Sequence, residues 1–485
     1  MHEKGSALLL AVILSFLLMA LGLGLTMSSL SEFTMSDEFE SHERALYIAD
    51  AGIGAVETSM RGRDLERALR EETLVPSYLG IPPETERDPI SIEEARDIDF
   101  NRPPEQVTQF RLTGMLTPSQ GVQVGRGRYF ARVTDNHDGD SDPLTDYDGR
   151  IFIRSVGVHP GPPQEVTLYG SNLKNSVVEI EKLLKRDMSF DASTPFNVYG
   201  PHARPSQNRF FDGNAFKIDG YDHSQMSIDE VLRGHHHRDG ESEHAAMGMI
   251  NDDLGGGDAT GSLREVYESL DRNQMSNLIG DEGPYGETPS IRDETDMIRE
   301  SPNGDAKNVF DAHFLNQFIN RVAAVADNRY DENTSLSGSN ILLGTEDDPQ
   351  ITVAMGDLSL SGNGSGSGIL VVKGKLEYSG AFDYNGLILV IGDGEVTISG
   401  ANKSIIGGLY LAEILQDENG EHLFGIPEFT ISGMTNFYFR SKSVHMAISL
   451  LPFRSIGWRE ITREISSPDR MTYPEDPRHA ASPNM

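Results

Sequence analysis

The chain begins with a long run of apolar positions. The 25 residues from Ser6 to Leu30, SALLLAVILSFLLMALGLGLTMSSL, carry no charge. As a helix this run is about 37 Å long, which exceeds the ~30 Å of a bilayer hydrocarbon core. A secretory signal peptide has a shorter apolar stretch followed by a small-residue cleavage site. The pattern therefore predicts a membrane-spanning helix. On hydropathy alone, a helix that serves only as a plain N-terminal membrane anchor fits this pattern equally well.

Helical periodicity continues beyond the apolar run. Apolar residues recur at steps of three, four and seven, and no proline occurs before Pro76. We therefore expect one helix over residues 6–60. Ahead of this helix, the positive charges of Lys4 and the amino terminus exceed the negative charge of Glu3. Because positive residues favour the cytoplasmic side, we expect a single-pass inner-membrane protein whose acidic remainder lies outside the cytoplasm.

The next segments have the pattern of strands. Residues 61–190 begin with a charged, proline-containing connector and continue with short alternating runs between Gly and Asp turns, which predict a β-rich domain. Residues 175–184 fit a strand or a short helix, and we favour a strand. Residues 191–334 are polar, with amphipathic helices expected at 262–279 and 310–327.

An internal repeat occupies residues 335–440. One strand-Ser-Gly unit recurs at 358–362, 376–380, 396–400 and 429–433, and a Gly-led apolar strand recurs at 368–372, 386–390 and 408–412. A period of about 20 residues built from short strands predicts stacked coils, a β-solenoid or β-helix, rather than a closed globule. An antiparallel meander is the alternative. Residues 441–485 are expected to form a helical cap over the open end of the solenoid, over 443–451, and a disordered tail. The predicted class is therefore α+β, with a long N-terminal helix, a mostly-β middle region and a C-terminal β-solenoid.

Composition narrows the classes of function. The chain of 485 residues has 41 Lys+Arg and 75 Asp+Glu, a formal charge of −34, and no cysteine. A strongly acidic protein is a poor ligand for nucleic acid or for an anionic lipid surface. Without cysteine it forms no disulfide, thiol nucleophile or Cys-ligated metal site.

One acidic loop is a candidate calcium site. Asp138, Asp140 and Asp142 take positions 1, 3 and 5 of a calcium loop, with the Leu144 carbonyl at 7 and Asp146 at 9. Pro143 at position 6 and Gly149 at position 12 exclude an EF-hand, and strands are expected on both sides. A calcium-clipped β-hairpin and a solvated acidic turn remain open.

Other polar clusters give weaker indications of chemistry. His235, His236 and His237 lack the helical spacing of a zinc site and fit a polar linker. The acidic pairs Asp347-Asp348 and Asp393 with Glu395 have no convergent His or Arg, so we expect no catalytic residues and no enzyme.

The N-terminal region resembles that of PilX-type pilus assembly proteins, which are minor, prepilin-like components of type IV pilus systems. The resemblance covers about 55 residues, namely EKGSALLLAVIL and the signature from Arg44 to Gly52, RALYIADAG. It implies prepilin peptidase cleavage after Gly5, so that residues 1–5 are a leader and Ser6 is the first, methylated mature residue. It also implies helix packing against other prepilins through Leu10, Ala11, Gly22, Gly24, Tyr47, Ala49, Asp50, Ala51 and Gly52. Major pilins carry Glu where Leu10 stands and usually begin with Phe or Met, so the departures favour a minor subunit.

These observations together predict a structural minor pilin of a type IV pilus or a related secretion pseudopilus. Its partners would be other pilin-like subunits, the inner-membrane assembly platform and the prepilin peptidase, and its large β domain would be displayed at a tip or priming position for adhesion. The alternatives are a membrane-anchored surface adhesin or glycan-binding protein and, with less support, a solenoid enzyme that degrades polysaccharide.

Overall fold

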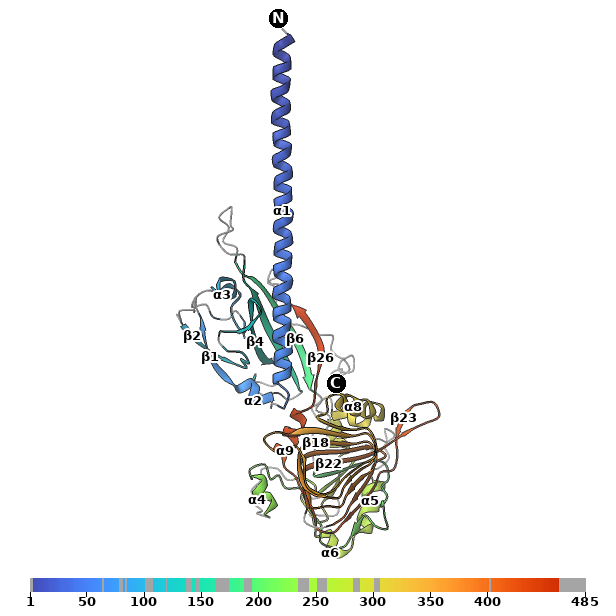
Figure 1. The fold of residues 1–485 in the computed structure, drawn as a ribbon. Helices are drawn as coiled ribbons and strands as arrows, with labels where there is room; N and C mark the ends of the chain where they lie inside the picture. The colour runs from blue at the N-terminus through green and yellow to red at the C-terminus, as the bar shows by residue number, and fades with distance from the viewer. Residues whose placement is uncertain are drawn as a thin grey trace, which may run out of the picture.

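The fold was analysed in a computed structural model (Figure 1). It describes residues 3–62, 65–77, 82, 85–100, 108–118, 120–136, 142–144, 146, 149–161, 174–186, 194–233, 244–250, 260–281, 288–300, 306–400 and 403–461. The described residues form one long helix, an antiparallel sheet packed on its carboxyl end, and a larger assembly of mostly parallel strands beyond the sheet. The expected α+β class is confirmed at this level.

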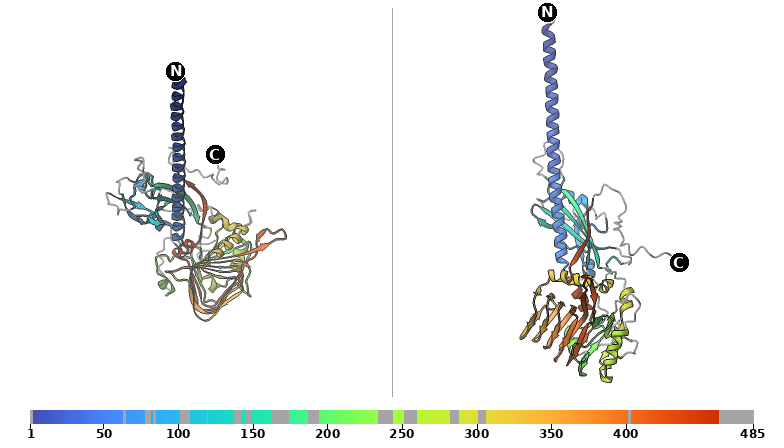
Figure 2. Two further views of the ribbon diagram at one scale, coloured as in Figure 1. Left: turned by 45° about the horizontal axis from the view of Figure 1, so that its top comes forward. Right: turned by 90° about the vertical axis from the view of Figure 1, so that its right-hand side faces the viewer.

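Helix α1 spans Glu3–Ser59 and projects far beyond the rest of the molecule (Figures 1 and 2). Its amino-terminal part is long and apolar enough to cross a membrane, and none of the most apolar stretch is buried. From Ala45 onward one face of the helix is buried in the protein. A single helix therefore joins an exposed apolar rod to a folded domain, as the uninterrupted periodicity predicts.

The sheet on which α1 packs is antiparallel, in the order β26-β6-β5-β4-β3. Its strands are β3 (Val122–Val124), β4 (Gly127–Asp135), β5 (Arg150–His159), β6 (Ser176–Arg186) and β26 (Phe453–Glu460). The strand predicted at 175–184 is thus confirmed as β6. Beside this sheet lie α2 (Leu65–Arg70), α3 (Ile92–Asp97) and an antiparallel pair, β1 (Glu72–Ser77) with β2 (Thr108–Thr113).

The two faces of this sheet have different cover. Side chains such as Ala131, Ile153 and Ile180 point toward α1 and form one apolar cluster with it. The opposite face packs Phe130, Val156 and Val158 against α3 and the residues just before it. Because successive strand residues alternate between faces, β4, β5 and β6 are buried on both sides. Their sequences are consequently nearly continuous runs of apolar residues with a few charged residues among them.

The second part is built from two ladders of mostly parallel strands (Figure 2). The larger follows the order β11-β9-β25-β22-β20-β18-β16-β13, with β7, β10, β12, β15 and β23 attached, and the smaller runs β14-β17-β19-β21-β24-β8. The strand bounds are β7 Phe196–Tyr199, β8 Phe211–Asp212, β9 Lys217–Asp219, β10 Met247–Ile250, β11 Leu278–Ile279, β12 Ile291–Asp293, β13 Asn328–Tyr330, β14 Thr334–Leu336, β15 Ser339–Leu343, β16 Gln350–Ala354, β17 Leu358–Leu360, β18 Asn363–Val372, β19 Leu376–Tyr378, β20 Phe382–Gly392, β21 Glu395–Ile398, β22 Lys403–Gln416, β23 His422–Phe424, β24 Glu428–Ser432 and β25 Thr435–Tyr438.

The register of the smaller ladder matches the sequence repeat. Leu358 pairs with Leu376, Leu376 with Val396, and Val396 with Phe429. All four side chains are fully buried between the ladders. The pairing is parallel throughout, so the alternative of an antiparallel meander is wrong for these strands.

The larger ladder corrects the alignment of its third copy by one residue. We expected Gly408 to follow Gly368 and Gly386, but Gly386 pairs with Gly407. Gly407, like Gly386, has a positive φ angle, 128° against 133°, which a side-chain-bearing residue rarely adopts. A one-residue slip moves every side chain to the other face of the sheet, so this register places Tyr410 outside and Leu409 inside.

The ladders extend beyond residues 335–440. Strands β7, β8, β9 and β11 come from the polar region and continue the two ladders, and β13 begins at Asn328. The sequences of these strands are too short, and the residues around them too polar, to show the two-residue alternation that predicts a strand. The helices of this region are α4 (Ile228–Leu232), α5 (Thr260–Ser269), α6 (Arg272–Met275), α7 (Thr295–Glu300), a 3₁₀ turn at Ala306–Phe310 and α8 (Ala312–Ala324).

Two helices cover the outer face of the larger ladder. Leu315, Phe318 and Val322 of α8 and Val444 and Ile448 of α9 (Ser441–Ser449) share one apolar cluster with the outward residues of β16, β18, β20 and β22. The helix expected at 443–451 is therefore present, but it crosses β18, β20 and β22 instead of capping an open end. The chain then returns to the first sheet as β26, within a segment for which a cap and tail were expected.

Candidate functional site

The exposed part of α1 is the most unusual surface of the described chain. Between Val12 and Phe39 its large apolar side chains are about half to three-quarters exposed, for example Phe16 at 70% and Leu25 at 72%. A continuous apolar surface of this size is unfavourable in water and marks contact with lipid or with other apolar helices. Gly22 and Gly24 lie in this stretch, and a Cβ on either glycine would meet nothing within 4 Å.

The predicted processing site lies at the start of the same helix. Gly5 and Ser6 belong to the helical backbone of α1, as do Leu10 and Ala11. The side chains of these four residues lie outside the described part, and cleavage after Gly5 stays a prediction.

The carboxyl end of α1 meets its sheet at very short range. A Cβ on Gly157 of β5 would come within 2.2 Å of the Ala45 carbonyl oxygen and 2.5 Å of the Ala49 nitrogen. A Cβ on Gly52 would come within 2.2 Å of Ser155 Oγ. Small residues on both sides therefore allow backbone to approach backbone, which fixes how the helix crosses the sheet.

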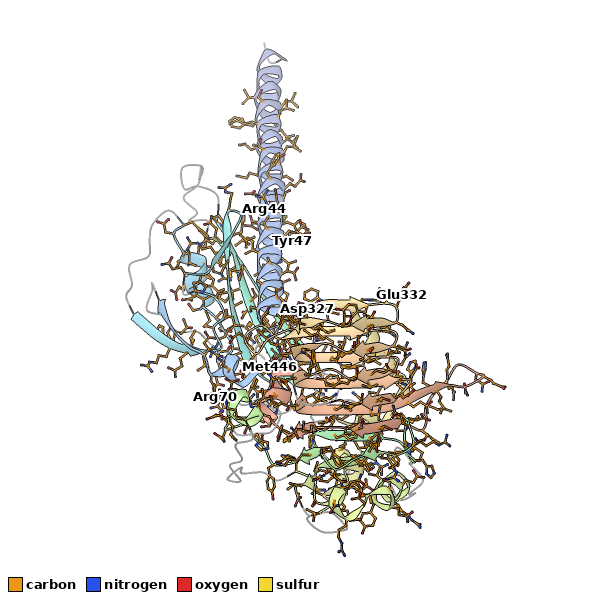
Figure 3. The ribbon with its side chains drawn as sticks, turned by 60° about the horizontal axis from the view of Figure 1, so that its bottom comes forward. Arg44, Tyr47, Arg70, Asp327, Glu332 and Met446 are labelled. Atoms are coloured by element: carbon orange, nitrogen blue, oxygen red, sulfur yellow. The ribbon has the colours of Figure 1, made fainter. Side chains whose placement is uncertain are left out.

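The signature around Tyr47 divides between two faces of α1. Ala49 and Gly52 are buried against the sheet, whereas Tyr47, Asp50 and Ala51 are exposed. Tyr47 projects from the free side of the helix (Figure 3). Ala49 and Gly52 thus pack within the chain, and the other three remain free to meet a second helix.

A row of charged side chains crosses the face of the antiparallel sheet that points away from α1. Arg132 pairs in register with Arg154, Arg154 with Glu181, and Glu181 with Arg459 of β26. Arg154 is 2% exposed, and its guanidinium also bonds Asp88 at 2.5 Å from the segment before α3. These ion pairs attach both the C-terminal strand and the residue 85–88 turn to the sheet.

Burial and the guanidinium groups set opposite pKa shifts in this row. Burial alone would raise the pKa of Glu181, but Arg154 hydrogen-bonds its carboxylate and lowers it below the usual range. For Glu179, burial dominates and the neighbouring Asp88 adds to it, so its pKa rises to about 8. Sequence reasoning missed this cluster, although Arg154, Glu179 and Glu181 stand at alternating positions in otherwise apolar strands.

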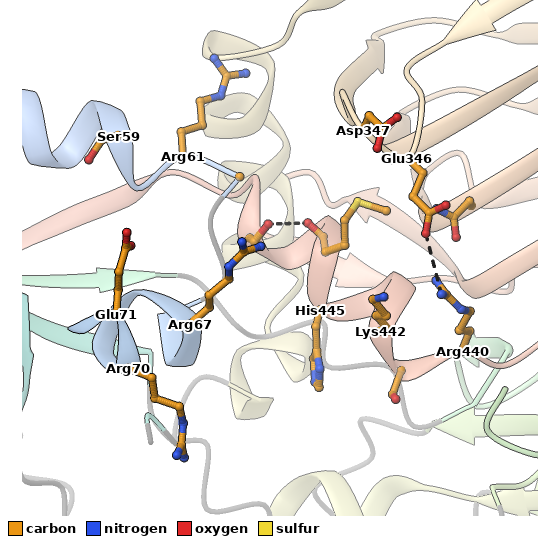
Figure 4. A pocket seen from close by; sticks show the side chains of 15 residues that line it. Ser59, Arg61, Arg67, Arg70, Glu71, Glu346, Asp347, Arg440, Lys442 and His445 are labelled. Carbon is orange, nitrogen blue, oxygen red and sulfur yellow. Dashed lines mark hydrogen bonds and ion pairs between the residues drawn. The ribbon is translucent and has the colours of Figure 1, made fainter. Parts of the chain in front are cut away.

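A cleft opens where α1 ends, between the two parts of the molecule (Figure 4). Its volume is about 1340 Å³, and it lies among α2, α9 and the loop at 346–347. Its charged and polar lining consists of the basic side chains of Arg61, Arg67, Arg70, Arg440 and Lys442, the carboxylates of Glu71, Glu346 and Asp347, and His445. Lys442 and His445 are exposed on α9, and Arg440 faces Glu346 at 3.8 Å. Arg61 also pairs with Asp327 at 3.0 Å and Arg70 with Asp142 at 3.2 Å, so positive and negative groups nearly balance in and around the cleft.

Only part of the predicted calcium loop is described. Asp138 and Asp140 lie outside the described residues. Asp142 pairs with Arg70 at 3.2 Å and accepts a bond from the Leu144 nitrogen, and Asp146 is nearly buried. Strands β4 and β5 flank the loop as expected. Calcium binding stays a prediction.

The remaining predicted polar clusters are only partly described. His235, His236 and His237 lie outside the described residues. Asp347 lines the cleft, and Glu395 pairs with Lys375 at 2.6 Å. Within the described ranges no group of three or more His, Asp or Glu side chains is placed to hold a metal ion.

Comparison with known proteins gives no relative. No family model matches the chain, no curated protein matches it, and no solved structure matches its fold.

Proposed function

We propose that this chain is a structural minor pilin-like subunit of a type IV pilus or a related pseudopilus. It would be assembled through its N-terminal helix and would display the large β part at a tip or priming position. The observation that carries the proposal is the division of α1. One uninterrupted helix leaves its apolar first part exposed and packs its last part on an antiparallel sheet.

This division suits a subunit that moves between two environments. In the inner membrane, lipid covers the apolar rod of a single-pass protein whose acidic bulk lies outside the cytoplasm. In a filament, apolar helices of other pilin-like subunits cover the same surface, aided by close approach at small residues such as Gly22 and Gly24. The prepilin peptidase and the inner-membrane assembly platform are the corresponding partners.

The two ladders are interpreted as the walls of a β-solenoid. Support comes from the parallel pairing, from the match between register and sequence repeat, and from the apolar cluster enclosed between the ladders. A stack of coils presents long, regular outer surfaces, as solenoid proteins use for binding. Its bulk is difficult to repeat tightly along a filament, which favours a position at the tip.

The competing proposal is a membrane-anchored adhesin or glycan-binding protein that is unrelated to pili. Its helix would serve as a permanent anchor and would need no cleavage. The two proposals differ in the fate of residues 1–5.

The deciding experiment measures the N-terminal mass of the chain purified from native membranes, with and without an active prepilin peptidase. The expected product begins at methylated Ser6 and appears only with the peptidase. A Gly5→Leu variant, which alters the residue before the cut, should stay full length in both. Full-length native protein in the presence of the peptidase would contradict the pilin proposal and favour the anchored adhesin.

A further inference from the structure

Two histidines from distant parts of the chain face each other beside the larger ladder. His313 lies in the first turn of α8, and His422 begins β23, the short strand that pairs antiparallel with the end of β22 (Figure 1). Their Nδ1 atoms are 3.4 Å apart, and their ring centroids are 5.4 Å apart. His313 is exposed and His422 is partly buried, so ions in the solvent can reach the pair.

Two amide side chains of α8 contact the other nitrogen of each ring. Asn316 Nδ2 lies 3.1 Å from His422 Nε2, and Gln317 Nε2 lies 2.7 Å from His313 Nε2. When both amides donate in this way, each neutral ring accepts at Nε2 and carries its hydrogen on Nδ1. Two Nδ1–H donors then face each other across 3.4 Å, and neither ring can accept the hydrogen of the other.

Rotation of the amides changes what the two rings present to each other. If both amides turn their oxygens to the rings, each Nε2–H donates to an amide oxygen and both Nδ1 lone pairs face the space between the rings. A metal-bound histidine has this arrangement, because its second nitrogen donates to an oxygen that fixes the tautomer. If only one amide turns, one Nδ1–H donates to the other Nδ1 and the pair is satisfied without a metal. The pair can therefore share either a proton or a cation.

The distance between the rings favours a tetrahedral cation. Two nitrogens that bind one zinc ion at ~2.0–2.1 Å in tetrahedral geometry lie about 3.4 Å apart, which matches the 3.4 Å between the two Nδ1 atoms. Neighbouring nitrogens of a square-planar copper(II) site would lie about 2.8 Å apart and fit less well. Glu418 and Glu421 are exposed on the turn just before His422, and their negative charge attracts cations to this place.

We propose that His313 and His422 bind one Zn²⁺ through their Nδ1 atoms, with water in the two remaining positions. Two protein ligands hold zinc less tightly than the four of a closed structural site, so the ion should exchange with the solvent. The zinc would join α8 to the β22–β23 hairpin, whose opposite face carries Leu415 and Leu423 at 48% and 52% exposure. This site uses no part of α1, so it is independent of whether the chain is a pilin-like subunit or an anchored adhesin.

Zinc binding by the full chain in detergent is the direct test. The protein is stripped with a chelator and dialysed against ZnCl₂, and its zinc content is measured by elemental analysis. Every chain carries alanine at positions 235–237, because that run of histidines can bind zinc by itself. His313→Ala and His422→Ala should each lose one equivalent of zinc relative to this parent, and the double variant should lose no more.

The matched control is His445→Ala, since His445 is an exposed histidine on α9. This variant should keep the zinc content of the parent, and Trp458 fluorescence shows that each variant is folded. An unchanged zinc content in either His313→Ala or His422→Ala would overturn the proposal, as would an equal loss in His445→Ala. The two rings would then share a proton.

Limited proteolysis tests whether the zinc joins the helix to the hairpin. A protease that cuts after glutamate should cleave the turn at Glu418 and Glu421 in the zinc-free parent, and zinc should slow this cleavage. In His313→Ala, zinc should have no effect, because α8 no longer supplies a ligand. Cleavage of the parent at the same rate with and without zinc would overturn the proposal.

Discussion

Two glycines of α1 show how much a single atom matters at the helix–sheet contact. Gly52 and Gly54 lie two residues apart in the same helix. A Cβ on Gly52 would meet Ser155 Oγ at 2.2 Å and the Tyr129 ring at 2.8 Å, whereas a Cβ on Gly54 would meet nothing within 4 Å. Both glycines are in the same helix, but only Gly52 packs against the sheet.

We therefore expect opposite effects from the same substitution. Gly52→Ala should lower the free energy of unfolding by about 1–3 kcal/mol, because the added methyl forces the helix away from β4 and β5. Gly54→Ala should raise it by roughly 0.5–1 kcal/mol, because alanine restricts the unfolded chain. Denaturant unfolding of the detergent-solubilised chain measures both, with the single Trp458 on β26 as the probe. Equal effects of the two substitutions would refute the close contact.

Glu179 makes the stability of the same sheet depend on pH. Its pKa is about 8 in the folded state against 4.5 ordinarily, chiefly because of burial. Between these values the folded state retains a proton that the unfolded state releases, so stability falls as pH rises through this window. Glu179→Gln should remove this loss, stabilising the protein at pH 8 relative to pH 5 by up to about 4 kcal/mol.

Glu181 provides the contrasting case. Arg154 lowers the folded pKa of Glu181, so its carboxylate stabilises the fold above its ordinary pKa and loses this effect only in acid. Glu181→Gln should destabilise the sheet at pH 8 by about 3–5 kcal/mol, because the buried Arg154 loses a partner. Trp458 unfolding curves at pH 5 and pH 8 test both residues, and identical pH profiles for the two variants would be inconsistent with this account.

At the scale of secondary-structure elements, neighbouring strands of the larger ladder approach one another closely at glycine residues. Gly386 has a φ of 133°, and a Cβ there would lie 2.1 Å from the Gly368 carbonyl oxygen on the neighbouring strand. Gly338 also has a positive φ, 113°, but a Cβ there would meet nothing within 4 Å. Comparison of Gly386 with Gly338 therefore separates the energetic cost of backbone strain from the cost of collision between strands.

Gly386→Ala should consequently disrupt the ladder far more than Gly338→Ala. Strain at positive φ costs about 1–3 kcal/mol in either variant, and collision with backbone adds roughly as much again at position 386. Thermal unfolding followed by circular dichroism, together with limited proteolysis, should show a lower midpoint and faster cleavage for Gly386→Ala. Similar midpoints would argue against the assigned register.

For the whole molecule, the two ends of α1 differ in what depends on them. Residues before Ser36 contribute no buried side chain among those described, whereas Ala45, Ile48 and Ala49 are part of the core beneath the sheet. On the proposed function, the first stretch would contact membrane lipid or other helices, whereas the second is part of the folded core.

Truncation should reveal this division. Removal of residues 1–35 should give a protein that stays in solution without detergent and unfolds at the same denaturant concentration as the full chain. Removal of residues 1–50 takes Ala45, Ile48 and Ala49 out of the core and should prevent folding of the sheet. Trp458 fluorescence and solubility measure both, and a shorter truncation that also fails to fold would mean that the exposed rod supports the domain.

Local pattern and tertiary contact determined different parts of this protein. The sequence alone determined the long helix, the strands β4, β5 and β6, and the 18- and 20-residue spacing of the smaller ladder, because burial imposes a period that each segment carries in its own residues. It also determined the candidate processing and calcium residues, whose identification needs only local spacing.

Tertiary structure decided what depends on partners distant in the chain. Strands β7, β8, β9 and β11 are too short to have a period and form because an existing ladder offers them hydrogen bonds. The return of β26 to β6, the charge row from Arg132 to Arg459, and the cleft between α2 and α9 join segments hundreds of residues apart. No local pattern encodes such contacts, since their energy appears only when both sides are in place.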